Sequence, residues 1–239
     1  MPVDLHDLMA EAVHRSQRTP EMAAIVLREA ILSGRFSDLQ PLRQEDLATQ
    51  LGVSKIPVRE ALRQLEAEGL VTFYPNRGVV VTTLSAAESD AIAEMRVALE
   101  TLAIRHAIDG LSPRDLRVAA SALDDLDHET DVARWSRHNW DFHARLYAPC
   151  GRPLLLSTIQ GLHTRVDRYI RLVLSTLGHQ AQSQREHRGL LDACSRRDIA
   201  GAVQVLTEHI EGAGSRLAAF LSLASKARRD ALAAVNASA

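Results

Sequence analysis

Residues 51–71 read LGVSKIPVREALRQLEAEGLV, and this stretch decides how the first part of the chain folds. Ser54 is a favourable N-cap for the helix that the following residues predict. Within that helix a four-residue spacing puts three cations on one face, namely Lys55, Arg59 and Arg63. A stripe of this kind is typical of a DNA-contacting surface, but also of a solvated face paired with glutamates. The flanking sequence has to separate these two interpretations.

The neighbouring segments predict a winged helix-turn-helix. EMAAIVLREAILSG (21–34) and RQEDLATQL (43–51) have the spacing of short helices, and RFSDLQPL (35–42) reads as a loop or short extended connection between them. LVTFYPNRGVVVTTL (70–84) is rich in β-branched and aromatic residues around the turn PNRG, which predicts a two-stranded hairpin. Residues 19–84 are therefore expected to form three helices and a wing, and the second helix of the pair would enter the major groove.

After residue 84 the pattern predicts helices only. Ser85 and Glu88 have the spacing of a capping box, Ser112 precedes a proline at a helix start, and a break is expected near Arg197–Asp198. The fold class is thus mainly α: an N-terminal winged helix-turn-helix, which is α+β, and an all-α antiparallel bundle of about six or seven helices. Four segments follow from this: an extension (1–18), the winged domain (19–84), an effector-binding and dimerisation domain (85–225) and a flexible tail (226–239).

Composition restricts the functional class. The net charge is −2, and residues 19–84 hold seven Lys/Arg against eight Asp/Glu, so any DNA contact depends on where cations are placed rather than on bulk charge. No apolar run reaches the ~18 residues that span a bilayer, and the N-terminus has no signal-peptide pattern. The two distant cysteines, Cys150 and Cys194, read as reduced thiols. We expect a cytoplasmic protein with no membrane partner.

Residues 42–81 resemble the N-terminal domain of the GntR family of bacterial transcription regulators. The run SKIPVREALRQLEAEGL and the NRG of the turn carry the resemblance. It implies base contacts from Arg59 and the residues before it, phosphate contacts from Arg43 and Arg63, and a wing tip at Arg77. The residues expected at double-stranded DNA are Arg43, Ser54, Lys55, Pro57, Arg59, Arg63, Asn76, Arg77 and Gly78. Family members more often carry arginine at the position of Lys55, and some read DNA with an arginine at the position of Glu45.

Residues 86–222 resemble the FCD effector domain of the FadR-type branch of that family, through EMRVALETLAIRHA, NWDFHARLYAPCGRPLLL and RRDIAGAVQVLTEHI. The resemblance implies a divalent metal site formed by Asn139, His143, His187 and His209. Zn²⁺, Ni²⁺ and Mn²⁺ all suit such ligands. Asn139 stands where the family usually has an acidic residue. Asp141 is expected to lie next to the ligands without binding the metal itself. A lone histidine on a helix is otherwise more often an ordinary core or surface residue.

Arginines in the helical domain are candidates for binding an effector. Arg96 lies on an otherwise apolar helix, where it either pairs with Glu100 on the surface or clamps an effector carboxylate. Arg165 is a second candidate, and Arg171 is a weaker one.

The sequence therefore predicts a homodimeric transcription regulator, not an enzyme, that binds an inverted repeat and senses a small organic or sugar acid at a metal site. Two alternatives remain. One is a regulator that responds to the metal alone. The other is a metal-dependent all-α enzyme, although no Asp or Glu beside the histidines offers an obvious general base.

Overall fold

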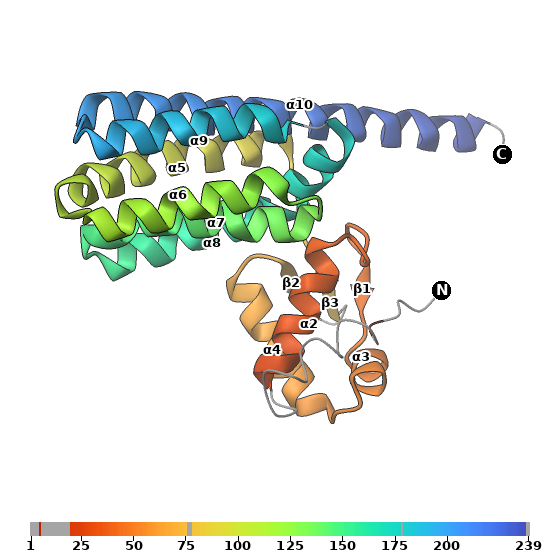
Figure 1. Ribbon diagram of the computed structural model, residues 1–239. Helices are drawn as coiled ribbons and strands as arrows, with labels where there is room; N and C mark the ends of the chain where they lie inside the picture. Colours follow the sequence, from red (N-terminus) through yellow and green to blue (C-terminus); the bar gives the residue numbers. More distant parts are fainter. Residues whose placement is uncertain (1–4, 6–19, 76–77, 178, 238–239) are drawn as a thin grey trace. The chain divides into compact units, whose positions relative to one another are not determined.

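The computed structural model describes residue 5 and residues 20–75, 78–177 and 179–237 (Figure 1), and the chain divides into two compact units after Thr83. The division falls one residue before the boundary expected from the sequence. The N-terminal unit is called the head below, and the second is called the helical unit.

The head contains three helices and a small sheet. In chain order its elements are α2 (Pro20–Leu32), β1 (Pro41–Leu42), α3 (Gln44–Leu51), α4 (Lys55–Ala67), β2 (Val71–Tyr74) and β3 (Gly78–Val81). Its core is formed by the apolar faces of the helices and one face of the sheet, including Leu27, Leu62 and Val79. Leu5, from the segment expected to be a separate extension, is also buried in this core. The winged helix-turn-helix that the sequence predicted is present.

The sheet has three strands, not the two that were expected. β1 pairs antiparallel with β3, which also pairs with β2, so the strand order is β1-β3-β2. The extra strand is only two residues long, which is too short to show an alternating pattern in the sequence. It begins with Pro41, which lacks the N–H of a ladder donor and is tolerated at such an edge.

The helical unit is a bundle of six α-helices within the described residues. They are α5 (Ala86–Ala107), α6 (Pro113–His128), α7 (Val132–Tyr147), α8 (Pro153–Leu177), α9 (Gln180–Ser195) and α10 (Ile199–Ala237), with two 3₁₀ turns, η1 (Ile108–Gly110) and η2 (Ala148–Cys150). α5 runs through the bundle and contacts α7, α8 and α10 (Figure 1). Side chains that face α5 from three helices therefore meet around its middle turns.

Local signals set the helix ends. The capping box of Ser85 and Glu88 is formed, and Ser112 makes a second one with Asp115. α9 and α10 are separated at the predicted break, where Arg197 has a φ of 58°. α10 continues to Ala237, through most of the segment that was expected to be a flexible tail. Its residues are good helix formers, and small size alone does not end a helix.

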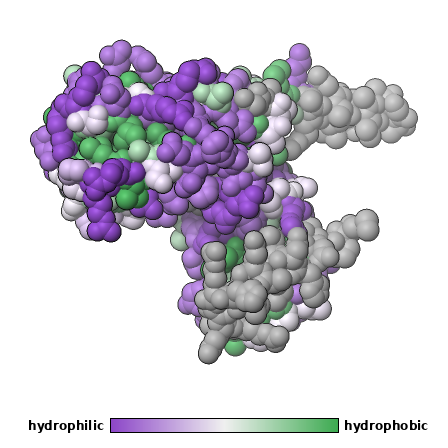
Figure 2. Space-filling model, in the orientation of Figure 1, coloured by the Kyte–Doolittle hydropathy of each residue, from purple (hydrophilic) through white to green (hydrophobic). Residues whose placement is uncertain are grey.

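The surface of the helical unit is mostly hydrophilic on the face shown in Figure 2, with a hydrophobic area enclosed by hydrophilic residues. Within the part of the chain that the structure describes, no helix combines the length and apolar character needed to cross a membrane.

Candidate functional site

The leading end of α4 projects from the head. α3 and α4 are joined by a tight turn in which Gly52 adopts a left-handed conformation (φ 62°), and its N–H bonds to the carbonyl oxygens of Ala48 and Thr49. One face of α4 is buried in the core through Val58, Ala61, Leu62 and Leu65. The opposite face leaves Lys55 and Arg59 exposed. Exposed cations at the start of the second helix are placed where a helix-turn-helix presents side chains to base edges.

Lys55 is paired with a residue of the preceding helix. Its ammonium group donates a hydrogen bond to the Glu45 carboxylate, and this bond and the charge of Lys55 lower the pKa of Glu45. Both side chains are mostly exposed, so water and salt screen the pair. Arg59 has no hydrogen bond or ion pair with any described residue. Of the two leading cations, Arg59 is the one available without breaking a contact.

Arg63 differs from its two neighbours in the stripe. Its guanidinium bonds to Glu66 at 2.8 Å and lies 3.9 Å from the centroid of the Phe73 ring. Glu66 also accepts a hydrogen bond from the Phe73 backbone N–H. Arg63 thus links α4 to strand β2, so its guanidinium, for which the resemblance implied a phosphate contact, already has partners within the head.

The remaining residues expected at DNA lie in two places. Arg43 is exposed at the N-cap of α3, Ser54 is the N-cap of α4 without a side-chain cap bond, and Pro57 lies in the first turn of α4. Gly78 begins β3 with a φ of 82°. Asn76 and Arg77 lie outside the described residues.

Three histidines from three helices converge inside the helical unit. His143 comes from α7, His187 from α9 and His209 from α10, and all three are buried. Their ring centroids are 4.7–5.4 Å apart, and one nitrogen of each lies within 4.8 Å of the others. The structure therefore brings together the three histidines that the resemblance implied.

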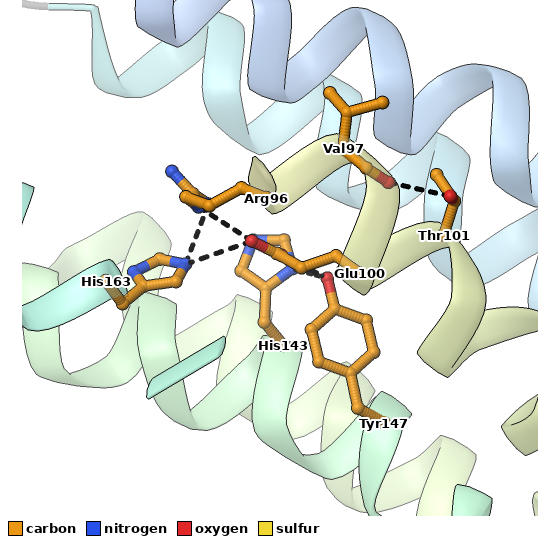
Figure 3. A network of polar contacts seen from close by, with 7 residues as sticks. All are labelled: Arg96, Val97, Glu100, Thr101, His143, Tyr147 and His163. Carbon is orange, nitrogen blue, oxygen red and sulfur yellow. Dashed lines mark hydrogen bonds and ion pairs between the residues drawn. The ribbon is translucent and has the colours of Figure 1, made fainter. Parts of the chain in front are cut away.

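Hydrogen bonds on the other side of the rings fix which nitrogen faces the centre. The Tyr147 hydroxyl donates its one hydrogen to Glu100 at 2.7 Å, so it accepts from His143 Nδ1 at 3.1 Å (Figure 3). His143 Nδ1 consequently carries the proton, and its Nε2 has a free lone pair. This Nε2 is buried and has no hydrogen-bond partner among the described residues. An imidazole prepared in this way is in the form that a metal ion requires.

The same arrangement holds for the other two rings. His187 Nδ1 lies 3.1 Å from Gln184 Oε1. The amide nitrogen of Gln184 donates to the Leu123 carbonyl and to the Asp127 carboxylate, so the amide oxygen is the atom that faces His187. His209 Nδ1 lies 2.6 Å from the Glu186 carboxylate. Since both partners accept, both histidines donate from Nδ1. The Nε2 atom of His187 is buried with no hydrogen-bond partner among the described residues. Burial lowers the pKa of His143 and His187 well below the ordinary value, which keeps these rings neutral.

Asn139 has a buried oxygen near this part of the bundle. Its Oδ1 is buried without a hydrogen-bond partner among the described residues, and the residue lies one turn before His143 on α7. Asn139 and His209 line a cavity of about 50 Å³ together with Arg96 and His163. Two orphaned imidazole nitrogens and an orphaned amide oxygen in a buried site fit a bound metal ion.

Arg96 is part of a buried network on the cavity wall. Its Nε donates to Glu100 at 2.7 Å and its Nη2 lies 2.8 Å from His163 Nε2 (Figure 3). The pairing with Glu100 that the sequence offered exists, but it is buried rather than on the surface. Because arginine only donates, His163 accepts through Nε2. Burial and the charge of Arg96 lower the pKa of His163.

His163 was not predicted from the sequence. The residue belongs to the buried stripe of α8, between Ile159 and Val166, and a histidine among apolar positions at helical spacing was the available signal. The partners of the metal-facing histidines were also missed.

Three other residues singled out in this unit are not among the side chains that line the cavity. Asp141 is exposed and lines an outer groove between α6 and α7, so it gives no support to the histidine cluster. Arg165 is exposed on α8 and is not among the side chains that line the cavity. Arg171 is buried but bonds to Asp167 at 2.8 Å. A helix turns by 100° per residue, so neighbours of a site residue in sequence often point away from it.

Two family models match this chain. Residues 20–81 match the family model "Bacterial regulatory proteins, gntR family", and residues 91–212 match that of the FCD domain. The HTH-type transcriptional regulator BphR of Paraburkholderia xenovorans is 32% identical over 203 residues, covering 81% of this chain and 83% of BphR. The HTH-type transcriptional repressor GlaR of Escherichia coli is 29% identical, covering 77% of this chain and 89% of GlaR.

A solved structure is similar over nearly the whole chain. It is a GntR-family transcriptional regulator from Pseudomonas syringae pv. tomato, with 32% identity, a TM-score of 0.56, and coverage of 94% of this chain and 97% of that one. These relatives are transcription regulators, not enzymes.

Proposed function

This chain belongs to the gntR family of bacterial regulatory proteins with an FCD domain, and it is a DNA-binding transcription regulator; we propose that a small carboxylate effector, bound at a metal site in its helical unit, controls its affinity for the operator. The observation that carries the proposal is the set of three buried histidines, each donating from Nδ1, with the Nε2 atoms of His143 and His187 left without a partner among the described residues. Asn139 Oδ1 is the fourth ligand. Imidazole with a neutral oxygen suits Zn²⁺, Ni²⁺ or Mn²⁺.

The effector class follows from the rest of the cavity wall. Arg96 reaches it with a guanidinium that Glu100 and His163 hold in place, and such a group favours a carboxylate. The remaining wall is partly apolar, with Ile170 and Leu217 among its residues. A volume of about 50 Å³ favours a small organic acid over a sugar acid unless the bundle opens.

At the DNA, two copies of the chain read an inverted repeat. Arg59 contacts bases, Arg43 contacts phosphate, and the segment with Asn76 and Arg77 acts as the wing. A homodimer is supported by exposed apolar residues on the helical unit: Met95 and Leu102 lie two turns apart on one stripe of α5, at 44% and 38% exposure. A dimer also matches the two-fold symmetry of such operators.

The test separates the metal from the effector. Duplexes selected from a random-sequence pool are titrated by fluorescence anisotropy with the metal-free protein, the Zn²⁺-loaded protein, and the loaded protein with lactate or gluconate. We expect an acid to shift the affinity only when zinc is bound. A full response to zinc with no acid present would show a metal-only regulator instead.

The metal site is tested independently of DNA. His187→Ala combined with His209→Ala should abolish bound zinc in elemental analysis while the head still binds duplex DNA, because the head is a separate compact unit. Unchanged zinc content would refute the site.

A further inference from the structure

The candidate metal centre contains no carboxylate. Among the described residues, the groups close enough to share an ion are the three histidines alone, and the fourth oxygen comes from the neutral amide of Asn139. The nearest acidic side chains have other partners. Glu100 accepts from Arg96 and Tyr147, and Glu186 accepts from the Nδ1 side of His209.

None of the groups that would ligate the ion carries a negative charge. A divalent cation held by three neutral imidazoles and one amide receives no compensating charge from its ligands in a buried site, where unpaired charge is costly. Two cationic side chains, Arg96 and Arg216, also line the cavity. An empty coordination position in these surroundings attracts an anion more strongly than water, and an anion in the cavity in turn lowers the cost of placing the cation.

We propose that the metal ion and a small anion bind this cavity cooperatively, so that each raises the affinity of the site for the other. This inference rests on the metal site proposed above and adds a mode of regulation to it. By linkage the two enhancement factors are equal. The regulator then responds when both are present, and Asn139 is the residue that sets this dependence.

Zinc titration by calorimetry tests the coupling, with acetate as the probe anion. Affinity is measured at fixed ionic strength in perchlorate, with and without saturating acetate. We expect zinc to bind about tenfold or more tightly in acetate, within the usual range of allosteric coupling. The weak zinc–acetate complex in solution acts against this change and cannot mimic it. Equal affinity in both buffers overturns the coupling but leaves the metal site intact, whereas zinc binding in neither buffer overturns the metal site itself.

Substitution of the amide gives a sharper result. Asn139→Asp is expected to tighten zinc binding without acetate and to remove most of the acetate effect, because the protein then supplies the missing charge. Asp141→Asn is the matched control on the same helix, and its exposed side chain should leave both affinities unchanged. If folded Asn139→Asp protein, checked by circular dichroism, keeps the full acetate effect, charge compensation at Asn139 is wrong.

A separate observation concerns the DNA-binding face. Ile56 follows Lys55 in the first turn of α4, and its side chain is 69% exposed, whereas Val58, Leu62 and Leu65 of the same helix are buried in the core of the head. It lies on the same exposed face as Arg59, three residues further on. The apolar group that the major groove offers to such a side chain is the C5-methyl of thymine.

We infer that Ile56 reads a thymine methyl group in each half-site. In duplexes selected from a random pool, each thymine is replaced in turn by deoxyuridine, which removes only that methyl. One replacement per half-site should weaken binding about threefold to fivefold, the order expected for one buried methyl group. Ile56→Ala should lose this sensitivity, while Ile25→Ala, an exposed isoleucine on α2, should keep it. If no thymine is sensitive, or if Ile56→Ala remains equally sensitive, the inference is wrong.

Discussion

The Tyr147 hydroxyl donates a 2.7 Å hydrogen bond to the Glu100 carboxylate, and both groups are fully buried. This bond uses the only hydrogen of the hydroxyl, so the oxygen can only accept from His143 Nδ1. Burial and the adjacent Glu100 raise the pKa of Tyr147, which keeps the phenol protonated. Glu100 on α5 thereby sets, through Tyr147, the tautomer of His143 on α7, which is a proposed metal ligand.

Tyr147→Phe should weaken metal binding. Without the hydroxyl, His143 Nδ1 has no acceptor and the ring is free to take the wrong tautomer. Loss of such a partner typically costs about 10–100-fold in metal affinity. Zinc affinity by competition with a chelating dye measures the loss, and ¹⁵N chemical shifts of the imidazole report the tautomer. Tyr169→Phe is the matched control, because that hydroxyl accepts from the Leu84 N–H instead. Equal losses in both variants would mean a general packing effect.

The metal-free protein should become less stable as the pH falls below about 6.5. Burial is the main reason why the pKa values of three histidines lie well below the ordinary value of 6.5, namely His143, His163 and His187. Below pH 6.5 the unfolded chain binds protons that the folded chain does not, so the free energy of unfolding drops. The slope is at most about 1.4 kcal/mol per pH unit for each histidine. Above pH 7 these groups add no further dependence.

Urea unfolding at pH 5.5, 6.5 and 7.5 measures this dependence for the transition of the helical unit. His163→Gln should reduce the slope, because glutamine can still accept from Arg96 but does not titrate, while His143 and His187 still do. The exposed His106 provides the control substitution, His106→Gln, which should leave the slope as it is. A curve that is flat in the wild-type protein contradicts the prediction.

The features of this protein that could be predicted from the sequence are those that depend on local patterns. The cap at Ser85 and the break near Arg197 are written in a few consecutive residues, and the run from Ser54 carried the family resemblance. The partners of two histidines could also have been predicted from local spacing, because Tyr147 lies four residues after His143 and Gln184 lies three residues before His187. The link between His209 and Glu186 could not, because it joins two helices across 23 positions. Contacts of that kind depend on how the helices pack, which a single sequence does not display.

The same substitution should have opposite effects at two glycines. Gly52 has a φ of 62°, so Gly52→Ala places an ordinary residue in the left-handed region and should destabilise the head by about 1–2 kcal/mol, although the added Cβ meets no atom. Gly161 lies inside α8, and a Cβ there also meets no atom. Gly161→Ala should therefore stabilise the helical unit by about 0.5–1 kcal/mol. Chemical denaturation measures both, and equal signs would contradict the conformational argument.

Arg59→Ala should weaken DNA binding, whereas Arg63→Ala should lower the stability of the head. Arg59 makes no hydrogen bond or ion pair with described residues, so its loss should leave folding unchanged and cost about 1–3 kcal/mol on the selected operator, with less effect on random DNA. Arg63 bonds to Glu66 and lies over Phe73, so Arg63→Ala should lower the stability of the head by about 1 kcal/mol. Anisotropy with specific and random duplexes, and urea unfolding of the head, give the two readouts. If Arg59→Ala weakens specific and random DNA equally, its contact is to phosphate and not to bases.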